Sequence, residues 1–123
     1  MKITKIDIVT RPSKLEELKD ALNAIGVLGM TVSQVYGCGL QRGHKEVFRG
    51  KEYDVNLVPK IKLETVVCEV PVEKVLEVAQ KVLRTGKFGD GKIFVYELAD
   101  AVRIRTGQRG VEAIMDIPGE KPE

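Results

Sequence analysis

Residues 36–60, YGCGLQRGHKEVFRGKEYDVNLVPK, decide how this chain is organised, because they separate two strand-like segments. The stretch carries four glycines, and its first half shows neither a helical nor a strand period. A structureless loop of roughly 15–20 residues is uncommon inside a compact domain and is usually functional or disordered. From composition alone, both a functional loop and a flexible hairpin tip stay open.

Apolar periodicity on both sides of this stretch predicts the order strand, helix, strand, strand, helix, strand. The expected elements are strands at residues 3–9, 30–35, 60–67 and 93–96, and helices at 15–25 and 71–83. The first helix is expected to begin at a capping box made by Ser13 and Glu16 and to end at Gly26. Val102 and Ile104 predict a further short strand.

This order of elements is that of the α+β ferredoxin-like fold, βαββαβ, in which one antiparallel sheet carries two helices on one face. The long loop then lies between the second and third strands. Residues 93–98 are apolar on both sides, so we expect the other face of the sheet to be buried by oligomerisation. We predict one domain over residues 1–115, with a flexible loop at about 38–57 and a flexible tail at 116–123.

The composition argues against several classes of protein. The chain has 123 residues and a net charge of +2, which implies neither a nucleic-acid partner nor direct membrane contact. It shows no apolar run near 18 residues and no signal-peptide region, and its two distant cysteines fit reduced thiols. We therefore expect a cytoplasmic protein. The single histidine, His44, argues against a zinc site.

Residues 85–92, TGKFGDGK, fit the letters of a P-loop from Gly86 onward. However, Ile93 follows where that motif needs a magnesium-binding hydroxyl, and this segment joins a helix to a strand, not a strand to a helix. We therefore reject a Walker A motif. Glycine amides with Lys87 and Lys92 can still surround an anion, and a plain tight turn is the alternative.

Arg103 and Arg105 project to the same side of their predicted strand. Such a pair forms either a solvated surface stripe or a fork for phosphate or carboxylate. Together with the glycine-rich loop and the Gly-Cys-Gly turn at 37–39, the pair points to one anion, best matched by a nucleotide. No nucleophile with an adjacent base is evident, so a dedicated enzyme is the weaker case.

Five motifs carry a resemblance to a known family: residues 37–44 (GCGLQRGH), 49–53 (RGKEY), 58–60 (VPK), 85–92 (TGKFGDGK) and 103–107 (RIRTG). With these motifs the chain resembles, over about residues 2–107, the PII signal-transduction proteins, which are the nitrogen and carbon sensors of bacteria, archaea and plastids. The resemblance implies a compact homotrimer with nucleotide sites in the clefts between subunits, where ATP and ADP compete.

In that family the long loop is called the T-loop, the glycine turn the B-loop, and the region after Val102 the C-loop. The resemblance implies that the two arginines reach the phosphates from the adjacent subunit. The implied ATP- and ADP-binding residues are Thr31, Gly37, Cys38, Gly39, Val66, Gly89, Asp90, Gly91, Lys92, Arg103 and Arg105.

The resemblance also implies binding of 2-oxoglutarate, but only together with Mg-ATP. Gln41 corresponds to the residue that helps to ligate Mg²⁺, and Lys60 to the lysine that pairs with a 2-oxoglutarate carboxylate. This division fits the chemistry, because a hard cation takes oxygen ligands and a dicarboxylate needs a cationic partner. The implied 2-oxoglutarate-binding residues are Gly39, Leu40, Gln41, Lys60 and Gly89.

Three positions in or beside the long loop bear on function. Tyr53 matches the family's uridylylated tyrosine, which permits that modification. Leu40 stands where the family often has a basic residue, and Cys38 where it often has a bulky apolar one. Both residues flank the ligand-binding turn, so we expect these two departures to bear on the affinity for 2-oxoglutarate.

The resemblance implies a regulator, not an enzyme, that reports energy and 2-oxoglutarate to an ammonium channel or to nitrogen-metabolism enzymes. Contact with the membrane would come only through such a channel. The alternatives are a divergent member acting mainly as an ADP/ATP sensor, and a slow ATPase. An RNA-binding ferredoxin-like sheet is disfavoured, because aromatic residues are 5% of the chain.

Overall fold

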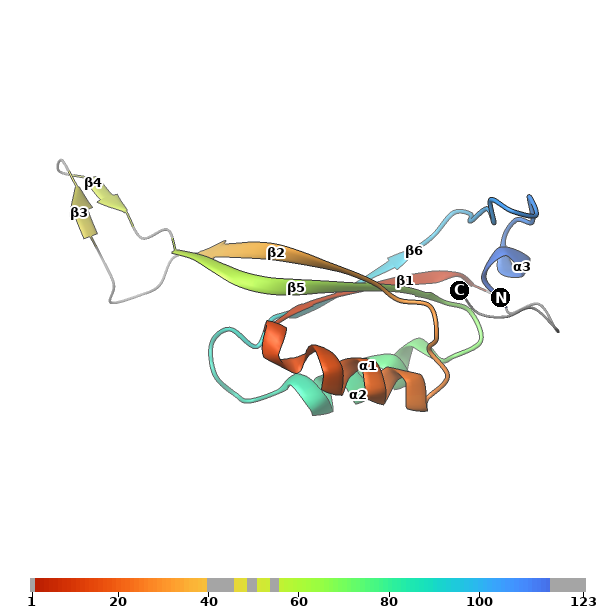
Figure 1. The fold of residues 1–123 in the computed structure, drawn as a ribbon, viewed down its shortest axis with the longest axis horizontal. Coiled ribbons are helices and arrows are strands. Elements are labelled where there is room, and N and C mark those ends of the chain that lie inside the picture. The colour runs from red at the N-terminus through yellow and green to blue at the C-terminus, as the bar shows by residue number, and fades with distance from the viewer. Residues whose placement is uncertain (1, 40–45, 49–50, 54–55, 116–123) are drawn as a thin grey trace.

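The computed structural model describes residues 2–39, 46–48, 51–53 and 56–115. Its main sheet has four antiparallel strands in the order β2-β5-β1-β6. They are β1 (Thr4–Thr10), β2 (Thr31–Gly39), β5 (Asn56–Val67) and β6 (Lys92–Glu97). Helices α1 (Leu15–Ala24) and α2 (Val72–Leu83) cover one face of this sheet (Figure 1). This arrangement confirms the predicted α+β ferredoxin-like fold.

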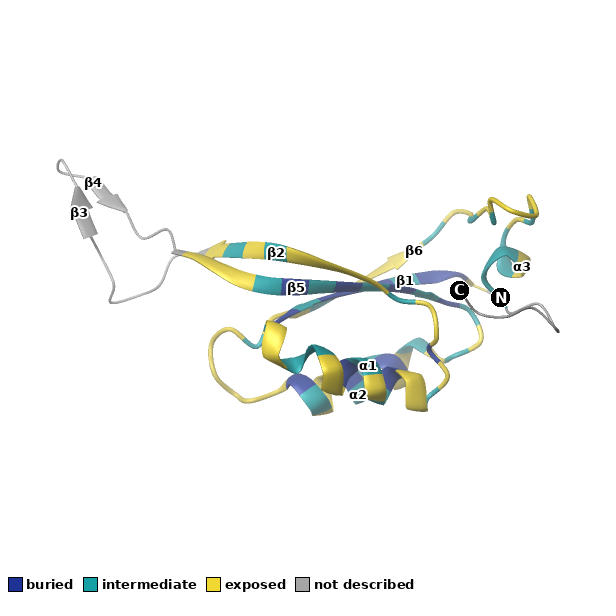
Figure 2. Cartoon of the chain, in the orientation of Figure 1, coloured by how far each residue is buried: buried dark blue, intermediate teal, exposed yellow. Residues whose placement is uncertain are grey.

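The core lies between the two helices and the middle strands, where Figure 2 shows the buried residues. Alternation along β1 sends Ile6 and Ile8 toward the helices, and Leu63 on β5 pairs with Ile8 in register. Each fully buried aliphatic side chain contributes about 1.5–3 kcal/mol. The buried cluster is Ile6, Ile8, Leu18, Leu22, Val27, Ile61, Leu63, Val67, Val75, Ala79 and Leu83.

The start of α1 differs from the sequence prediction. The predicted capping box does not form, and no side chain caps this helix. Instead, Pro12–Lys14 makes a 3₁₀ turn, η1, with Pro12 at its first position, and α1 follows directly from it. A proline's fixed φ suits the first turn of a helix, so the chain enters through Pro12 and Ser13 becomes part of the turn.

The end of α1 was predicted correctly. Gly26 adopts a φ of +95°. The Val27 amide donates to the Leu22 carbonyl at 3.0 Å, and the Gly26 amide donates to the Asn23 carbonyl at 3.0 Å. These two bonds are those of a Schellman motif, which satisfies the last helical carbonyls. Helix α2 also matches its prediction: Pro71 stands at its N-cap, and Val75, Ala79 and Leu83 are buried.

Strands β2 and β5 are longer than predicted and shorten the long loop from both ends. Their ladder continues to Gly39, paired with Asn56, so both ends of the stretch at 36–60 are strand. Figure 1 shows this ribbon running well past the helices. Pro59 fits there because β1 ends opposite Ile61, which leaves one side of β5 unpaired beyond that point. Two short strands, β3 (Glu46–Phe48) and β4 (Lys51–Tyr53), pair with each other.

The predicted strand at Val102 and Ile104 is wrong. Val102 makes only an isolated bridge to Arg109, and a turn follows it at residues 104–106. The Gly107 amide donates to the Arg103 carbonyl at 2.7 Å, with Gly107 at a φ of +74°. The segment from Val102 to Gly107 therefore forms a tight turn and does not join the sheet, although its apolar residues alternate as in a strand. A single helical turn, α3 (Val111–Ile114), follows.

The face of the sheet opposite the helices carries both charges and exposed aromatic side chains. Lys5 and Lys62 lie 3.3 Å from Glu64 and 3.4 and 3.8 Å from Asp7. Hydrogen bonds from Lys62 and Lys5 lower the pKa of Glu64. Phe94 and Tyr96 on β6 are each 45% exposed, and a sheet face of this kind is normally covered. These features agree with the predicted burial by oligomerisation, which stays a prediction.

Candidate functional site

The glycine-rich loop at residues 85–91 joins α2 to β6. Gly86, Gly89 and Gly91 have φ values of +83°, +95° and +103°, which side chains rarely allow. Gly91 is the most constrained, because a Cβ there would lie 1.9 Å from the Val9 carbonyl oxygen. The loop therefore passes directly against the end of β1, and this contact requires glycine.

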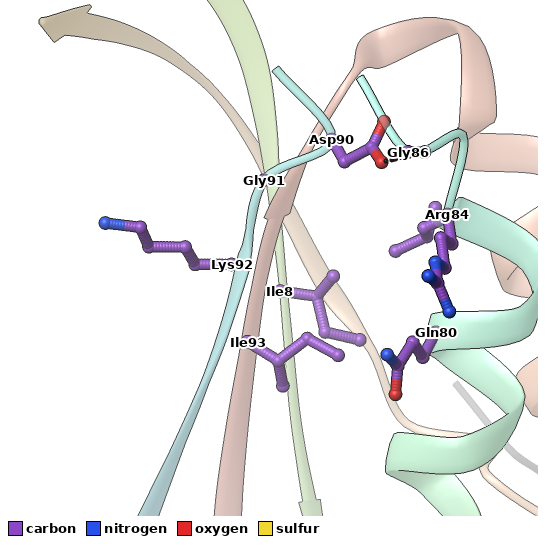
Figure 3. A pocket seen from close by; sticks show the side chains of 9 residues that line it. Ile8, Gln80, Arg84, Gly86, Asp90, Gly91, Lys92 and Ile93 are labelled. Carbon is purple, nitrogen blue, oxygen red and sulfur yellow. Dashed lines mark hydrogen bonds between the residues drawn. The ribbon is translucent and has the colours of Figure 1, made fainter. Parts of the chain in front are cut away.

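The Asp90 carboxylate holds the loop in its folded shape. It accepts hydrogen bonds from the Thr85 amide at 2.8 Å and the Gly86 amide at 2.9 Å, and also from the Thr85 hydroxyl and the Arg11 guanidinium. Figure 3 shows this carboxylate turned toward Gly86. The Thr85 hydroxyl and the Arg11 guanidinium, followed by the two amides, hold the pKa of Asp90 far below its usual range.

Asparagine at position 90 is expected to lower stability at neutral pH, and the difference from the unchanged chain should shrink in acid. The lowered pKa of Asp90 means that its stabilising contribution is present above about 3.8, the ordinary value, and is lost as the pH falls below it. Denaturant unfolding of both proteins from pH 7 to pH 2 measures this, because the loss begins near pH 3.8 and continues below it. Asp20→Asn, at an exposed position of α1, is the matched control. A difference that stays constant with pH would contradict the role given to Asp90.

Three side chains hold three successive carbonyls of the same loop. Arg11 Nη2 donates to the Phe88 carbonyl at 2.8 Å, Lys60 Nζ to the Gly89 carbonyl at 2.7 Å, and Thr10 Oγ1 to the Asp90 carbonyl at 2.8 Å. Sequence reasoning missed Thr10 and Arg11. Once the fold was assigned, register could have found them, because Val9 pairs with Lys92 and so places the end of β1 beside this loop.

Lys60 links the glycine loop to the base of the long hairpin. It pairs with Val35, and a Cβ at Gly37 would lie 3.5 Å from the Lys60 Cγ. The structure therefore brings Gly37, Lys60 and Gly89 together, three residues assigned above to ATP or 2-oxoglutarate. Cys38 and Gly39 follow along the same ribbon, paired with Leu57 and Asn56. Their roles in binding stay predictions.

Thr31, Val66 and Lys92 share the open face of the sheet with Lys60. The strand register shows this. Lys62 and Lys92 both pair with Val9, Val66 pairs with Lys5, and Thr31 pairs with Glu64. Residues two apart on a strand point to the same face, so Lys60, Lys62, Glu64 and Val66 lie on one side of β5 together with their partners. These pairs form neighbouring rows on the side away from the helices. The predicted adenine residues Thr31 and Val66 and the predicted phosphate residue Lys92 therefore line one surface that ends at the glycine loop.

A cavity of about 360 Å³ lies on the opposite side of this loop, between α2 and β6. In Figure 3, Ile8 and Ile93 point toward Gln80 of α2 and toward Arg84, which follows the helix, whereas Lys92 points the other way. The cavity is thus on the helix side, and the Lys92 ammonium is on the open side. Lys92 is among the residues that line this cavity, but its side chain points away from Ile8 and Ile93.

Arg103 and Arg105 do not reach the glycine loop of their own chain. Arg103 Nη2 donates to the Met115 carbonyl at 2.6 Å, and its Nε donates to the Ala113 carbonyl at 3.3 Å. Arg105 lies in the turn at 104–106. Figure 1 shows α3 at the end of the molecule opposite the glycine loop. Any contact of these arginines with a bound phosphate would need a second subunit.

Several predicted residues fall outside what the structure describes. Leu40, Gln41, His44 and the tail at 116–123 are not described, and Tyr53 is described only as part of the β4 backbone. In the described ranges, no group of three His, Cys, Asp or Glu side chains could hold a metal ion. The same part of the chain contains no helix with the length and apolar character to span a membrane.

Comparison with known proteins assigns the family. A family model described as nitrogen regulatory protein P-II matches residues 3–108. The chain belongs to the P-II family. The nitrogen regulatory PII-like protein of Bacillus subtilis (strain 168) is 51% identical over 110 residues, which are 89% of this chain and 95% of that protein. The resemblance found in the sequence is therefore confirmed.

Two solved P-II structures show what relatives can bind. The ATP complex of B. subtilis GlnK superposes with a TM-score of 0.78 at 47% identity, over 91% of this chain and 95% of the other. The Arabidopsis thaliana PII bound to citrate superposes with a TM-score of 0.71 at 38% identity, over 91% and 92%. The first holds a nucleotide, and the second a carboxylate.

Proposed function

We infer that this P-II protein is a cytoplasmic signalling sensor that binds ATP or ADP in clefts between the subunits of a homotrimer. With Mg-ATP it also binds 2-oxoglutarate, and it regulates nitrogen metabolism through its T-loop, acting on an ammonium channel or on enzymes. One observation carries this proposal. Lys60 joins a glycine loop, three of whose carbonyls are held by side chains, to the base of a long projecting ribbon. A ligand bound at that junction would contact both the glycine loop and the base of the ribbon.

Nucleotide binding is supported by the surface that the predicted residues form. Thr31 and Val66 lie along the open face, and the glycine loop and the Lys92 ammonium lie at its end. Such a surface offers polar and apolar contacts for a base, and backbone amides with a cation for phosphates. The B. subtilis relative solved with ATP supports a nucleotide as the occupant.

Binding of 2-oxoglutarate is supported by Lys60. An ammonium group has three donors, and only one is used by the Gly89 carbonyl at 2.7 Å. The others can pair with a carboxylate while the bond to the loop is kept. Citrate binding by a plant relative shows that a family member accepts a carboxylate. Mg²⁺ would bridge the ATP phosphates and the keto acid through the Gln41 side chain.

The homotrimer is supported by the open face of the sheet. Asp7 there is only 2% exposed, and its Oδ1 is held only by an ion pair with the Lys5 ammonium, 3.4 Å away, among the described residues. A buried carboxylate oxygen held only by such an ion pair can accept a further hydrogen bond, and the exposed Phe94 and Tyr96 beside it need cover. Neighbouring subunits would supply both, and they would also carry Arg103 and Arg105 to the clefts.

A regulatory role fits the site better than catalysis does. In the described part of the site, the Asp90 carboxylate is taken up by Thr85, Gly86 and Arg11, so it is not poised as a base. A slow ATPase is the alternative from the enzyme class, and a turnover assay at saturating Mg²⁺ separates the two. A sensor restricted to ADP and ATP is the alternative within the family.

Calorimetric titration of 2-oxoglutarate, with and without Mg-ATP, tests the proposal most directly. The proposal expects binding only when Mg-ATP is present. Binding of ATP without any binding of 2-oxoglutarate would make the protein an adenylate sensor, with Cys38 and Leu40 as the residues to examine. Binding of neither ligand would reject the proposed function.

Arg103→Ala is expected to weaken ATP binding roughly 10- to 100-fold, since a hydrogen bond to a charged group contributes about 1.5–3 kcal/mol. Calorimetric titration measures the affinity. Arg84→Ala removes the same charge from an exposed position outside the predicted site and is the matched control. Because Arg103 also holds two carbonyls near α3, thermal unfolding should be recorded for both variants. Unchanged ATP affinity would remove Arg103 from the site.

A further inference from the structure

We propose that Arg11 is a positioning residue of the nucleotide site, and that it aims the backbone amides of the glycine loop at the ligand. The proposal rests on the proposed function, since it assumes that an anion binds at this loop. Arg11 directly follows β1, and from outside the loop it bonds two of the loop's groups, the Asp90 carboxylate and the Phe88 carbonyl.

The first step of the argument concerns the direction of the loop's peptide units. The carbonyls of Phe88, Gly89 and Asp90 are held by Arg11, Lys60 and Thr10 respectively. No peptide bond in the described chain is cis. In a trans peptide the N–H points opposite to the C=O.

Each of the amides of Gly89, Asp90 and Gly91 therefore points away from the side chain that holds the carbonyl of the same peptide. Successive amides whose directions are fixed in this way, in a loop with glycines of positive φ, can together form a backbone site for anionic oxygens. The three side chains thus set the direction of the amides before any ligand arrives.

The second step concerns why an arginine suits this position. A guanidinium is planar and carries donors at fixed angles, so one side chain can bond a carboxylate with Nη1 and a carbonyl with Nη2. Its Nη2 lies 3.2 Å from where a Cβ on Gly89 would be, so the guanidinium lies directly against the backbone of the loop. Its charge faces the Asp90 carboxylate. Arg11 therefore acts through geometry and adds little net attraction for a phosphate.

The test compares Arg11→Ala, Arg11→Lys and Asp90→Asn, alone and as the Arg11→Ala/Asp90→Asn double variant. ATP affinity is measured by calorimetry at two ionic strengths, and the Gly89 and Gly91 amide signals are recorded by NMR without ligand. Arg11→Ala is expected to lower ATP affinity about tenfold and to shift both amide signals. Lysine should restore part of this affinity, because one donor remains.

The double variant distinguishes positioning from direct contact. Arg11 acts through the same loop that Asp90 holds, so the effects of the two substitutions should not add. The double variant should bind ATP about as weakly as whichever single variant has the lower ATP affinity. The salt dependence should match that of the unchanged protein. Losses that multiply, together with a weaker salt dependence, would mean direct phosphate contact and would overturn the proposal.

Unchanged ATP affinity in Arg11→Ala, with the unchanged protein binding normally, would also overturn the positioning role while leaving the proposed function intact. Failure of the unchanged protein to bind ATP would instead reject the proposed function. Thermal unfolding of each variant shows whether a loss of binding comes from a loss of fold.

Discussion

Alanine at position 91 is expected to lower ATP affinity by well over tenfold and to reduce the free energy of unfolding by roughly 2–4 kcal/mol. Two causes act together at this residue. Gly91 has a φ of +103°, which an alanine rarely adopts, and the new Cβ would lie 1.9 Å from the Val9 carbonyl oxygen. That oxygen belongs to the backbone of β1 beside Lys92, so it cannot move away without disturbing the β1–β6 ladder.

Gly86→Ala separates the clash from the backbone strain. Gly86 belongs to the same loop and has a φ of +83°, but a Cβ there meets nothing within 4 Å. The hydrogen bond from the Gly86 amide to the Asp90 carboxylate comes from the backbone, so an alanine can also donate it. We expect a loss of only about 1 kcal/mol and near-normal ATP binding. Denaturant unfolding and calorimetry measure both variants, and equal behaviour of the two would show that the contact with Val9 does not matter.

The sequence was enough for the fold because its apolar periods matched the core. In α2, Val75, Ala79 and Leu83 follow a helical period and are buried together. In β1, Ile6 and Ile8 alternate with residues that face the other side. These patterns follow from burial itself, so they can be read without coordinates. The glycine loop was also recognised, because its glycines mark positions of positive φ.

The details that failed depended on local competition between alternative hydrogen bonds. The residues of a capping box are present at Ser13 and Glu16, yet Pro12 made a 3₁₀ turn the easier start of α1. Val102 and Ile104 alternate as in a strand, yet Gly107 let the chain close a turn first. A short alternating pattern does not show whether a neighbouring strand is available to pair with it.

The contacts of the site were predictable only in part, because they combine residues that are distant in the sequence. Lys60 and Gly89 were assigned to one ligand by family resemblance, and the structure joins them directly. Arg11 carries no motif of its own. Its role follows from the register of β1 with β6, which places residues 79 positions apart within hydrogen-bond distance. Residue identity alone does not give such register.

Lys60→Ala is expected to weaken 2-oxoglutarate binding in the presence of Mg-ATP by roughly 10- to 100-fold, since the variant leaves a carboxylate without its cation. Its effect on ATP should be much smaller. The Lys60 ammonium also holds the Gly89 carbonyl at 2.7 Å, so a modest loss of ATP affinity would come from a looser loop. Calorimetric titrations of ATP, and of 2-oxoglutarate at saturating Mg-ATP, measure the two effects separately.

Lys60→Gln separates the charge of Lys60 from its bond to the loop. A glutamine amide can still donate to the Gly89 carbonyl but brings no positive charge to a carboxylate. If the lysine acts as the cation for 2-oxoglutarate, glutamine should preserve ATP binding and lose 2-oxoglutarate as severely as alanine does. If glutamine instead retains 2-oxoglutarate, the lysine serves the loop only, and the carboxylate must be bound by other groups. Equal losses of both ligands in both variants, with lowered thermal stability, would show that Lys60 is needed for the fold and would contradict its place in the effector site.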